Sequence, residues 1–302
     1  MSLVICKVPR AGLGNQLFPI MKAFTFGHIN RLPVIVTGYS QLKIGPYLRR
    51  EKVKRNYQGY FNFQKTFFAE QIDKWRLRIN KKFQVCSEPS LQEIINEREE
   101  APTMFVYSEI PQWNDYFGGL REHRQTVVKL FNDLISQGIK KKIALQQPPC
   151  IGVHIRMGDF RKLKDGEDFS KVGAVRTPED YFINLILAIR KMHGSALPVS
   201  VFTDGYAHEF EKLFLLDHIK LIEGNPDLVD MVLLSKSKII IASAGSTFSY
   251  WAGFLANAPL ILHPDHIHQP IRPTEINGNW YEGGWDSNNS ILVNNIRNIQ
   301  AN

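Results

Sequence analysis

The chain has 302 residues, of which 44% are hydrophobic and 22% charged, which excludes a largely disordered protein and allows two domains of ordinary size. Its formal net charge of +8 favours anionic partners, namely nucleotides, phosphates, acidic glycans, nucleic acid or a membrane surface, without choosing among them. The three cysteines form no CxxC pair, so we expect reduced thiols in a reducing compartment. The first ten residues do not form a signal peptide, and we expect a cytoplasmic protein with at most peripheral membrane contact.

The first half of the chain begins with a predicted strand at 3–8, followed by a glycine loop and a helix whose apolar residues have helical spacing. A second strand is predicted at 32–36 and a helix at 120–145. Residues 43–68 combine basic and aromatic side chains, which suit the faces of sugars and acidic glycans, so they are the candidate acceptor site. A solvated basic face above a packed aromatic core is the alternative interpretation.

The paired prolines Pro148 and Pro149 separate two predicted domains, 1–148 and 149–302, because they cannot continue a helix. Regular alternation of strands and helices after this point predicts a parallel sheet with crossover helices. The expected strands are 150–155, 199–202, 219–222, 239–242 and 259–262, and the expected helices are 178–193, 208–215, 227–235 and 247–255. The uncharged run 239–262 is long enough to span a bilayer, but its polar turn favours strand, helix and strand.

The loop Gly12-Leu13-Gly14-Asn15-Gln16 lies between the first strand and the first helix. Glycines let the backbone approach a ligand closely, and the amino terminus of a helix favours an anion. The third glycine of the dinucleotide fingerprint GxGxxG is absent, and a simple tight turn explains the loop equally well.

A second loop contains His154, Arg156 and Asp159, directly after a predicted buried strand. Ligands of open α/β sheets bind outside the carboxyl ends of strands, where Arg156 would offer a fork of donors to a phosphate or carboxylate. The pattern therefore indicates a phosphorylated ligand. The alternative is an Arg156–Asp159 ion pair that only fastens the loop.

Two further loops follow predicted strands. Asp204 would bind a ribose hydroxyl or cap the next helix. The segment Ser243-Ala244-Gly245-Ser246-Thr247-Phe248 would cradle a phosphate at a helix amino terminus, or act as an ordinary Ser/Thr cap. Together, the four loops would line one crevice between two sheets, as in a nucleotide-sugar transferase with two facing lobes.

The sequence has no Asp-x-Asp pair, which is the usual way for a transferase to hold a divalent metal against a diphosphate. His263, Asp265, His266 and His268 have no standard metal-site spacing, so a solvated loop is expected there. Cationic side chains and helix termini would then stabilise the leaving diphosphate, a role that suits Arg156.

Four segments occur in a familiar order: Gly12-Leu13-Gly14-Asn15-Gln16-Leu17-Phe18, Gly59-Tyr60-Phe61, His154 to Phe160 and Ser243 to Ala252. They resemble GLGNQLF, G-Y-F-Q, H-x-R-R-G-D-Y/F and N-S-S-F-S-W-W-A/G of the α-1,2-fucosyltransferases in glycosyltransferase family 11, and they extend over most of the chain. The resemblance implies an α/β, GT-B-like fold in which two Rossmann-like lobes, an acceptor-side and a donor lobe, face a central cleft. It also implies GDP-fucose as donor, no metal or other cofactor, and inversion at the anomeric carbon.

The resemblance also implies roles for single residues. Arg156 would contact the diphosphate and His154 the nucleotide, while Asp230 would contact guanine. Asp159 is the nearest carboxylate in sequence and is either the catalytic base or a group that orients Arg156. The other implied donor-binding residues are Gly12, Gly14, Asn15, Gln16, Gly245, Ser246, Thr247 and Phe248, to which the strand-end argument adds Asp204.

Two positions depart from the family pattern. Met157 replaces the second Arg of H-x-R-R, and Ala244-Gly245 replaces a small polar pair. The expected function is transfer of fucose to an acceptor glycan, with α-1,2 linkage, in bacterial surface polysaccharide synthesis. Another donor sugar or an inactive GDP-sugar binder is the alternative. A nucleic-acid partner is not expected, because the basic residues are scattered.

Overall fold

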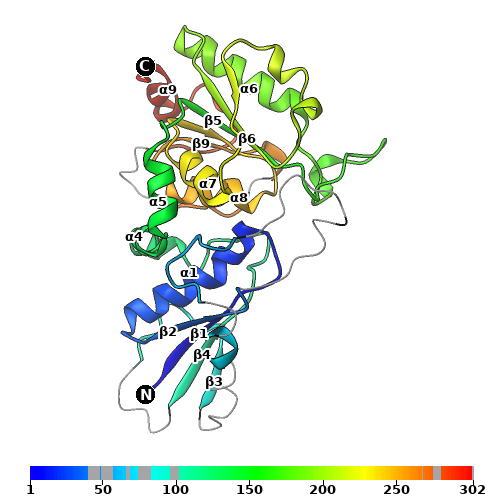
Figure 1. The fold of residues 1–302 in the computed structure, drawn as a ribbon. Coiled ribbons are helices and arrows are strands. Elements are labelled where there is room, and N and C mark those ends of the chain that lie inside the picture. Colours follow the sequence, from blue (N-terminus) through cyan, green and yellow to red (C-terminus); the bar gives the residue numbers. More distant parts are fainter. Residues whose placement is uncertain are drawn as a thin grey trace. The chain divides into compact units, whose positions relative to one another are not determined.

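The computed structural model describes residues 1–39, 48, 57–65, 69–73, 83–95, 102–266, 268–274 and 280–300. The described residues belong to two compact units. The first unit holds those of Met1–Lys43 and Arg55–Lys141, and the second holds those of Ile44–Lys54 and Lys142–Asn302 (Figure 1). Each unit contains its own parallel sheet, so each is described by itself.

The first unit is built on a four-stranded parallel sheet in the order β2-β1-β4-β3. Its strands are β1 (Leu3–Lys7), β2 (Val34–Thr37), β3 (Gln84–Ser87) and β4 (Thr103–Tyr107). Its helices are α1 (Leu13–Ile29), η1 (Arg121–His123), α4 (Arg124–Leu134) and α5 (Gln137–Ala144), the last of which extends into the second unit.

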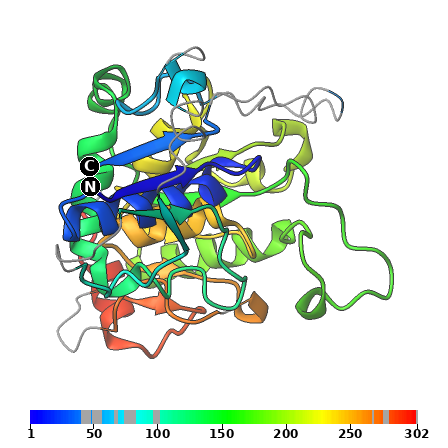
Figure 2. The ribbon, with the colours of Figure 1, turned by 90° about the horizontal axis from the view of Figure 1, so that it is seen from below.

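Helix α1 covers the sheet of the first unit and runs alongside β1 (Figure 2). Its buried Phe26 packs against Phe105 and Tyr107 of β4, with ring centroids 5.0 and 5.7 Å apart. At Gly27, a Cβ atom would lie 2.5 Å from the side chain of Val34, so only glycine allows the helix this close to β2. The core of this unit therefore lies between α1 and the two central strands.

The second unit is built on a six-stranded parallel sheet in the order β10-β9-β8-β5-β6-β7. Its strands are β5 (Ile151–Ile155), β6 (Val199–Thr203), β7 (Ile219–Leu221), β8 (Ile239–Ile241), β9 (Leu260–Ile261) and β10 (Glu282–Gly283). Its helices are η2 (Phe169–Lys171), α6 (Glu179–His193), η3 (Ala207–Glu209), η4 (Leu213–Leu215), α7 (Asp227–Ser235), α8 (Thr247–Leu255), η5 (Pro264–His266) and α9 (Ser290–Arg297).

Helices cover both faces of this second sheet, with α6 on one side and α7 and α8 on the other (Figure 1). Every residue of β5 is buried, as expected for a central strand of a covered parallel sheet. At Gly152, a Cβ atom would collide with Ser237 and come within 2.8 Å of Leu234, so α7 packs directly on β5. This packing fixes β5 against α7 and thereby positions the start of the loop that follows β5.

Most elements predicted for the second unit are confirmed, and α7 and α8 have the predicted bounds. The run 239–262 forms β8, α8 and β9, and no helix in the described part of the chain has the length and hydropathy needed to cross a membrane. The helix predicted at 208–215 is wrong, because the segment forms the short turns η3 and η4. There, the amide of Leu213 donates to the carboxylate of Glu179 (2.7 Å) instead of continuing a helical ladder.

The single helix predicted at 120–145 is divided into η1, α4 and α5. Ile135 interrupts it in an extended conformation, because it forms an antiparallel bridge with Phe61. Ser136, the next residue, continues this contact by donating its amide to the carbonyl of Tyr60 (2.9 Å).

The tail of the chain is fastened by Arg272, whose side chain is completely buried. Its guanidinium donates to Glu282 (3.0 Å) and to the carbonyls of Ala258 and Tyr281 (both 2.8 Å). Glu282 also accepts the amide of Ile271 (2.6 Å). These bonds attach β10 to β9 and give the tail, which the sequence patterns did not resolve, a defined place in the sheet.

Candidate functional site

The pairing of β5 with β6 brings Arg156 and Asp204 together. Ile155 lies opposite Thr203 in the parallel register, so the residues that follow leave the sheet side by side. Arg156 Nη1 donates to Asp204 Oδ2 (2.5 Å), and the amide of Met157 donates to Asp204 Oδ1 (2.7 Å). At Gly158, a Cβ atom would collide with the Asp204 carboxylate. Asp204 therefore positions Arg156 rather than capping the next helix, which corrects the capping alternative.

A second carboxylate binds the other arm of the Arg156 fork. Arg156 Nη2 donates to Asp159 Oδ1 (2.6 Å), so the ion pair considered as an alternative is present. The two carboxylates differ in exposure, since the side chain of Asp159 is 42% exposed and that of Asp204 13%. The guanidinium itself lies 5.5 Å from the ring of Phe160 and is 20% exposed. The guanidinium of Arg156 is thus bound by the mostly buried Asp204 on one arm and by the more exposed Asp159 on the other.

The loop after β8 is tied to the loop after β5 by Ser243. The Ser243 hydroxyl accepts the amide of Arg156 (2.8 Å) and donates to the carbonyl of His154 (2.9 Å). This hydroxyl is buried and replaces the ladder bonds that end with β5 and β8. Ser243 belongs to the segment that was predicted to cradle a phosphate, but its role in joining the two loops was not predicted.

His154 lies under the first turn of α8. Its imidazole stacks on the ring of Phe248, with centroids 4.7 Å apart and an interplanar angle of 22°. Burial and the nearby charge of Arg156 lower the pKa of His154 to about 3, so the ring is neutral at physiological pH. Its Nδ1 is buried and finds no hydrogen-bond partner within the described residues. His154 therefore offers an uncharged polar edge beside a cation.

The loop before α8 is shaped by side chains from elsewhere in the unit. The amide of Ala244 donates to Thr177 Oγ1 (3.0 Å), and that of Gly245 donates to the hydroxyl of Tyr250 (2.8 Å). Gly245 has φ of +66°, a conformation that favours glycine. Ser246 makes no side-chain capping bond, so the ordinary Ser/Thr cap is not formed. Buried Thr177 had no sequence signal that linked it to this loop.

The predicted guanine contact, Asp230, lies in the first turn of α7. Its carboxylate accepts a hydrogen bond from the side chain of Asn225 (3.0 Å). Asp230 belongs to the same unit as Arg156, and its helix α7 packs beside α8. Its role in binding a base stays a prediction.

The remaining predicted donor-binding residues belong to the first unit. Gly12 precedes α1 in an extended conformation, and Gly14 is buried within the helix. The side chain of Gln16 donates to the carbonyl of Pro9 (3.1 Å), which fixes the loop after β1. The side-chain oxygens of Asn15 and Gln16 are buried and have no hydrogen-bond partner among the described residues. A cleft shared by the two units stays a prediction.

The segment 43–68, the predicted acceptor site, is described only at Leu48 and at 57–65. Of its described aromatic residues, Tyr57, Tyr60 and Phe61 are buried and Phe63 is partly buried. The Tyr57 hydroxyl accepts the amide of Leu13 (2.9 Å) at the start of α1. These aromatic residues pack inward, as the alternative interpretation expected, and the basic residues at 43–47 and 49–55 lie outside the described residues.

The histidines after β9 form an aromatic cluster. The ring of His263 lies 4.7 Å from Phe169 and 4.6 Å from Tyr181, and His266 Nε2 lies 3.0 Å from the carbonyl oxygen of Phe169. His268 Nε2 lies 3.1 Å from the hydroxyl of Tyr250. No group of three His, Cys, Asp or Glu side chains within the described ranges could hold a metal ion.

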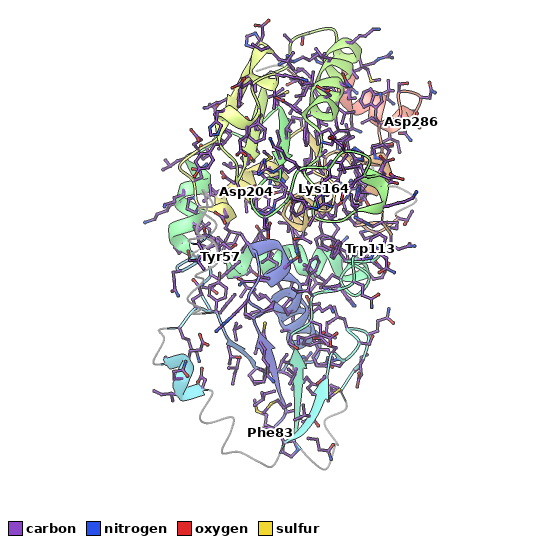
Figure 3. The ribbon with its side chains drawn as sticks, turned by 90° about the vertical axis from the view of Figure 1, so that its right-hand side faces the viewer. Tyr57, Phe83, Trp113, Lys164, Asp204 and Asp286 are labelled. Carbon is purple, nitrogen blue, oxygen red and sulfur yellow. The ribbon has the colours of Figure 1, made fainter. Side chains whose placement is uncertain are left out.

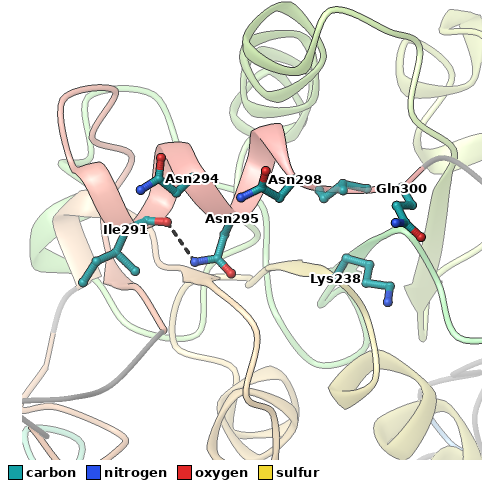
Figure 4. Close-up of a pocket in the computed structure, with 7 residues that line it drawn as sticks. Lys238, Ile291, Asn294, Asn295, Asn298 and Gln300 are labelled. Carbon is teal, nitrogen blue, oxygen red and sulfur yellow. Dashed lines mark hydrogen bonds between the residues drawn. The ribbon is translucent and has the colours of Figure 1, made fainter.

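Two pockets lie in the second unit. One, of about 570 Å³, is lined by Met157, Arg176, Glu209 and other residues beside the loop after β5. The other, of about 460 Å³, is lined by Lys238 and by the side of α9 that carries Asn294 and Asn298 (Figure 4). Because Lys238 precedes β8, this second pocket lies at the amino end of the sheet, away from the Arg156 loop.

The chain is similar in sequence to known glycosyltransferases. The sequence profile described as Glycosyl transferase family 11 matches residues 21–262. An alpha-1,2-colitosyltransferase from Escherichia coli is 26% identical over 277 residues, which cover 86% of this chain and 90% of the relative.

Two solved structures have a similar fold. The fucosyltransferase NodZ from Bradyrhizobium has a TM-score of 0.52 at 15% identity, covering 89% of this chain and 100% of the other. POFUT1 in complex with GDP has a TM-score of 0.51 at 12% identity, covering 86% of this chain and 98% of the other. With the two parallel sheets, these likenesses confirm the predicted α/β, GT-B-like fold class.

Proposed function

The chain belongs to glycosyltransferase family 11 and is a glycosyltransferase of the fucosyltransferase type, and on this premise we propose that it transfers fucose from GDP-fucose to a hydroxyl group of an acceptor glycan. We further propose inversion at the anomeric carbon, an α-1,2 linkage and a role in bacterial surface polysaccharide synthesis. The name of the E. coli relative supports the linkage. The family motifs at Gly12, His154 and Ser243 support the donor.

The forked contact of Arg156 with two unlike carboxylates carries this proposal. Asp204 is mostly buried and also accepts the amide of Met157, so it keeps the guanidinium in place. Asp159 is 42% exposed, and an exposed ion pair is worth about 1 kcal/mol or less. A diphosphate would displace Asp159 from Nη2 at little cost, while Nη1 stays on Asp204. The donor diphosphate would then receive a guanidinium arm whose direction is already set.

The amino terminus of α8 would bind the other side of the diphosphate. Ser246 leaves the first turn of this nine-residue helix without a side-chain cap, and the helix end carries partial positive charge. The amides of Ala244 and Gly245 are bonded to Thr177 and Tyr250, so they shape the loop rather than bind phosphate. Thr247 and Phe248 of the first turn would supply the amides for the ligand.

His154 would contact the nucleotide as a neutral group. A protonated imidazole would repel Arg156, whereas the neutral ring leaves the guanidinium as the cation of this network. The stacking on Phe248 orients the ring. Its Nδ1, which lacks a partner in the described part of the protein, would then hydrogen-bond to the donor.

In the proposed reaction, the oxygen of an acceptor hydroxyl forms a bond to the anomeric carbon of fucose. The bond between that carbon and the GDP β-phosphate oxygen breaks, and both of its electrons leave with GDP. Arg156 stabilises the growing negative charge on the diphosphate, an effect comparable to about 3–4 kcal/mol for an oxyanion-hole donor. Asp159, released from Nη2 by the diphosphate, takes up the proton of the acceptor hydroxyl.

Two alternatives to this function are each supported by a specific observation. The E. coli relative transfers a colitosyl group according to its name, so nucleotide-activated colitose is the second candidate donor. An inactive GDP-sugar binder is suggested by Met157, which replaces an Arg of the family pattern. The side chain of Met157 packs into the hydrophobic core of the unit and its amide binds Asp204, so this position supplies backbone and no charge.

A thermal-shift screen with GDP, UDP, CDP and their sugars tests the proposal. A ligand at 100 times its Kd stabilises the native state by about 2.7 kcal/mol, so GDP and GDP-fucose are expected to raise Tm most. Incubation of GDP-fucose with glycan acceptors should then release GDP and yield a fucosylated product. A Tm that responds to UDP or CDP but not to GDP would contradict the proposed donor. GDP binding without transfer to any acceptor would favour the inactive binder.

A further inference from the structure

The loop that follows β4 in the first unit is built as a rigid surface feature. It begins at Ser108, directly after a central strand of the parallel sheet. The carboxyl ends of parallel strands are where ligands of α/β units bind. The neighbouring central strand β1 ends at the Gly12 loop, so the loops after β1 and β4 lie at the same edge of the sheet.

Glu88 fixes the start of this loop. Its carboxylate oxygen Oε1 accepts the amides of Ser108 (2.6 Å) and Glu109 (2.8 Å), and Oε2 pairs with Lys22 of α1 (3.4 Å). Glu88 has φ of +49°, which is uncommon for a residue other than glycine. Three contacts from one carboxylate therefore hold the loop against both β3 and α1.

Two aromatic side chains fix the end of the loop. The ring of Tyr116 stacks on Phe18 of α1 with centroids 5.7 Å apart, and the buried Phe117 meets Phe18 edge-on at 5.1 Å. Arg121 adds an ion pair to Asp115. Both ends of the loop are therefore fastened to α1, at Lys22 and at Phe18.

Trp113 lies between the two fastened ends, and it is 68% exposed (Figure 3). Ile110 on the same loop is 38% exposed. Exposing an indole forgoes part of the stabilisation that its burial would give, and at 68% exposure most of this ring is accessible to a ligand. Gln112 and Asn114 flank it and are also exposed, so amide donors and acceptors surround an aromatic face.

We infer that this loop, residues 108–117, binds the acceptor glycan, with the indole of Trp113 stacked on one face of a pyranose ring. The inference rests on the proposed function and names the surface that receives its second substrate. The negative face of an aromatic ring attracts the polarised C–H groups of a sugar, and the amides of Gln112 and Asn114 match its hydroxyls. A loop held at both ends presents this platform with little loss of conformational entropy on binding.

Direct binding of sugars tests the inference without requiring turnover. The probes are methyl β-D-galactopyranoside, methyl α-D-mannopyranoside and methyl N-acetyl-β-D-glucosaminide. The binding of each glycoside is measured by the change in tryptophan fluorescence. At least one should change the emission of the wild-type protein, and Trp113→Ala should abolish that change. Trp113→Phe should retain binding with severalfold lower affinity. Val85→Ala, at a 66% exposed position on β3, is the control and should respond like the wild type.

Kinetics give the second readout. With the responding glycoside as acceptor, Trp113→Ala should raise the acceptor KM about tenfold and leave kcat within twofold. The Tm increase caused by GDP should be unchanged. An unchanged acceptor KM, or an equal fluorescence response in wild type and Trp113→Ala, would overturn the inference, as would no response to any glycoside. A missing GDP response in the wild type would instead overturn the proposed function and leave the sugar-binding result to stand alone.

Discussion

Two arginines of the second unit show how the same side chain serves two purposes. Arg272 is fully buried and donates to Glu282 and to backbone carbonyls of neighbouring elements. Arg156 is 20% exposed and donates to two carboxylates, one buried and one exposed. Both guanidinium groups lie near an aromatic ring, that of Trp280 or that of Phe160.

The difference lies in what a ligand could replace. The carbonyls around Arg272 belong to the folded backbone, and removing them would require unfolding of the tail. The outer partner of Arg156 is Asp159, a partly exposed carboxylate that another anion could replace. The proposed ligand-binding role of Arg156 therefore follows from the kind of partner it has, and not from its burial or from its number of hydrogen bonds.

The largest expected effect separates the two arginines by stability. Arg272→Met would leave the mostly buried Glu282 carboxylate without its cation, and breaking such a pair costs about 3–5 kcal/mol. We expect a fall in Tm of several degrees, measured by calorimetry. Arg161→Met is the control, because its ion pair with Glu167 is exposed and should contribute little to stability. Equal losses in the two variants would remove the structural role of Arg272.

The next largest effect is on transfer activity and is expected at Arg156 rather than at Arg272. Arg156→Lys keeps the charge but loses the fork, so transfer should slow at least a hundredfold, equivalent to about 3 kcal/mol. Tm should stay within a few degrees of the wild type, and Arg161→Lys should transfer normally. The measurement is kcat/KM with GDP-fucose. Near-normal turnover of Arg156→Lys would take this arginine out of the mechanism.

A third effect concerns the pH dependence of stability, to which the buried His154 contributes. Burial and the charge of Arg156 lower the pKa of His154 to about 3, against about 6.5 in an unfolded chain. Between these values unfolding takes up a proton, so the free energy of unfolding should fall as the pH decreases from about 6.5. His154→Asn should remove roughly 2–4 kcal/mol of this fall, measured by urea unfolding from pH 7 to pH 4. The control is His208→Asn, at an exposed position. If the free energy of unfolding decreased equally between pH 7 and pH 4 in both variants, the pKa of His154 would not be lowered by folding.

The smallest effect concerns the affinity for GDP and is expected at the outer carboxylate, Asp159. Asp159→Asn removes the charge that competes with the diphosphate, so the Kd of GDP should decrease two- to fivefold, less than about 1 kcal/mol. Asp204→Asn should instead weaken GDP binding, since Arg156 loses its buried support. Isothermal titration measures both. The pH–rate profile of Asp159→Asn should also lose its acid limb, and a normal profile would exclude Asp159 as the base.

Sequence patterns predicted many elements whose signals are local, but the buried central strand β4 was not predicted. Helices α7 and α8 begin after Pro226 and Ser246 and carry continuous apolar faces, and both have the predicted bounds. Strand β3 was not predicted because it is short and lies at the edge of the sheet, where the side chains of Gln84 and Val85 are exposed. Helix α9 was missed because Asn294 and Asn295 have low helix propensity, so its formation depends on packing of Leu292 and Ile296.

The candidate site was predictable only in part, for a related reason. Arg156 and Asp159 are three residues apart, so their pairing was a possibility that the sequence itself suggested. The pairing of Arg156 with Asp204 depends on the register of β5 with β6, which a sequence does not specify. The contacts of Thr177 and Ser243 arise in the same way, from residues that meet only after the sheet has formed.

The bond between Asp204 and Arg156 has a thermodynamic consequence for the moment of substrate arrival. A free arginine side chain carries about 2 kcal/mol of rotamer entropy. In this protein most of that disorder is given up when the sheet forms and Asp204 takes hold of Nη1. If Arg156 binds the donor diphosphate as proposed, the ligand would meet a guanidinium arm whose direction is already set, and more of its binding energy would be available for the chemical step.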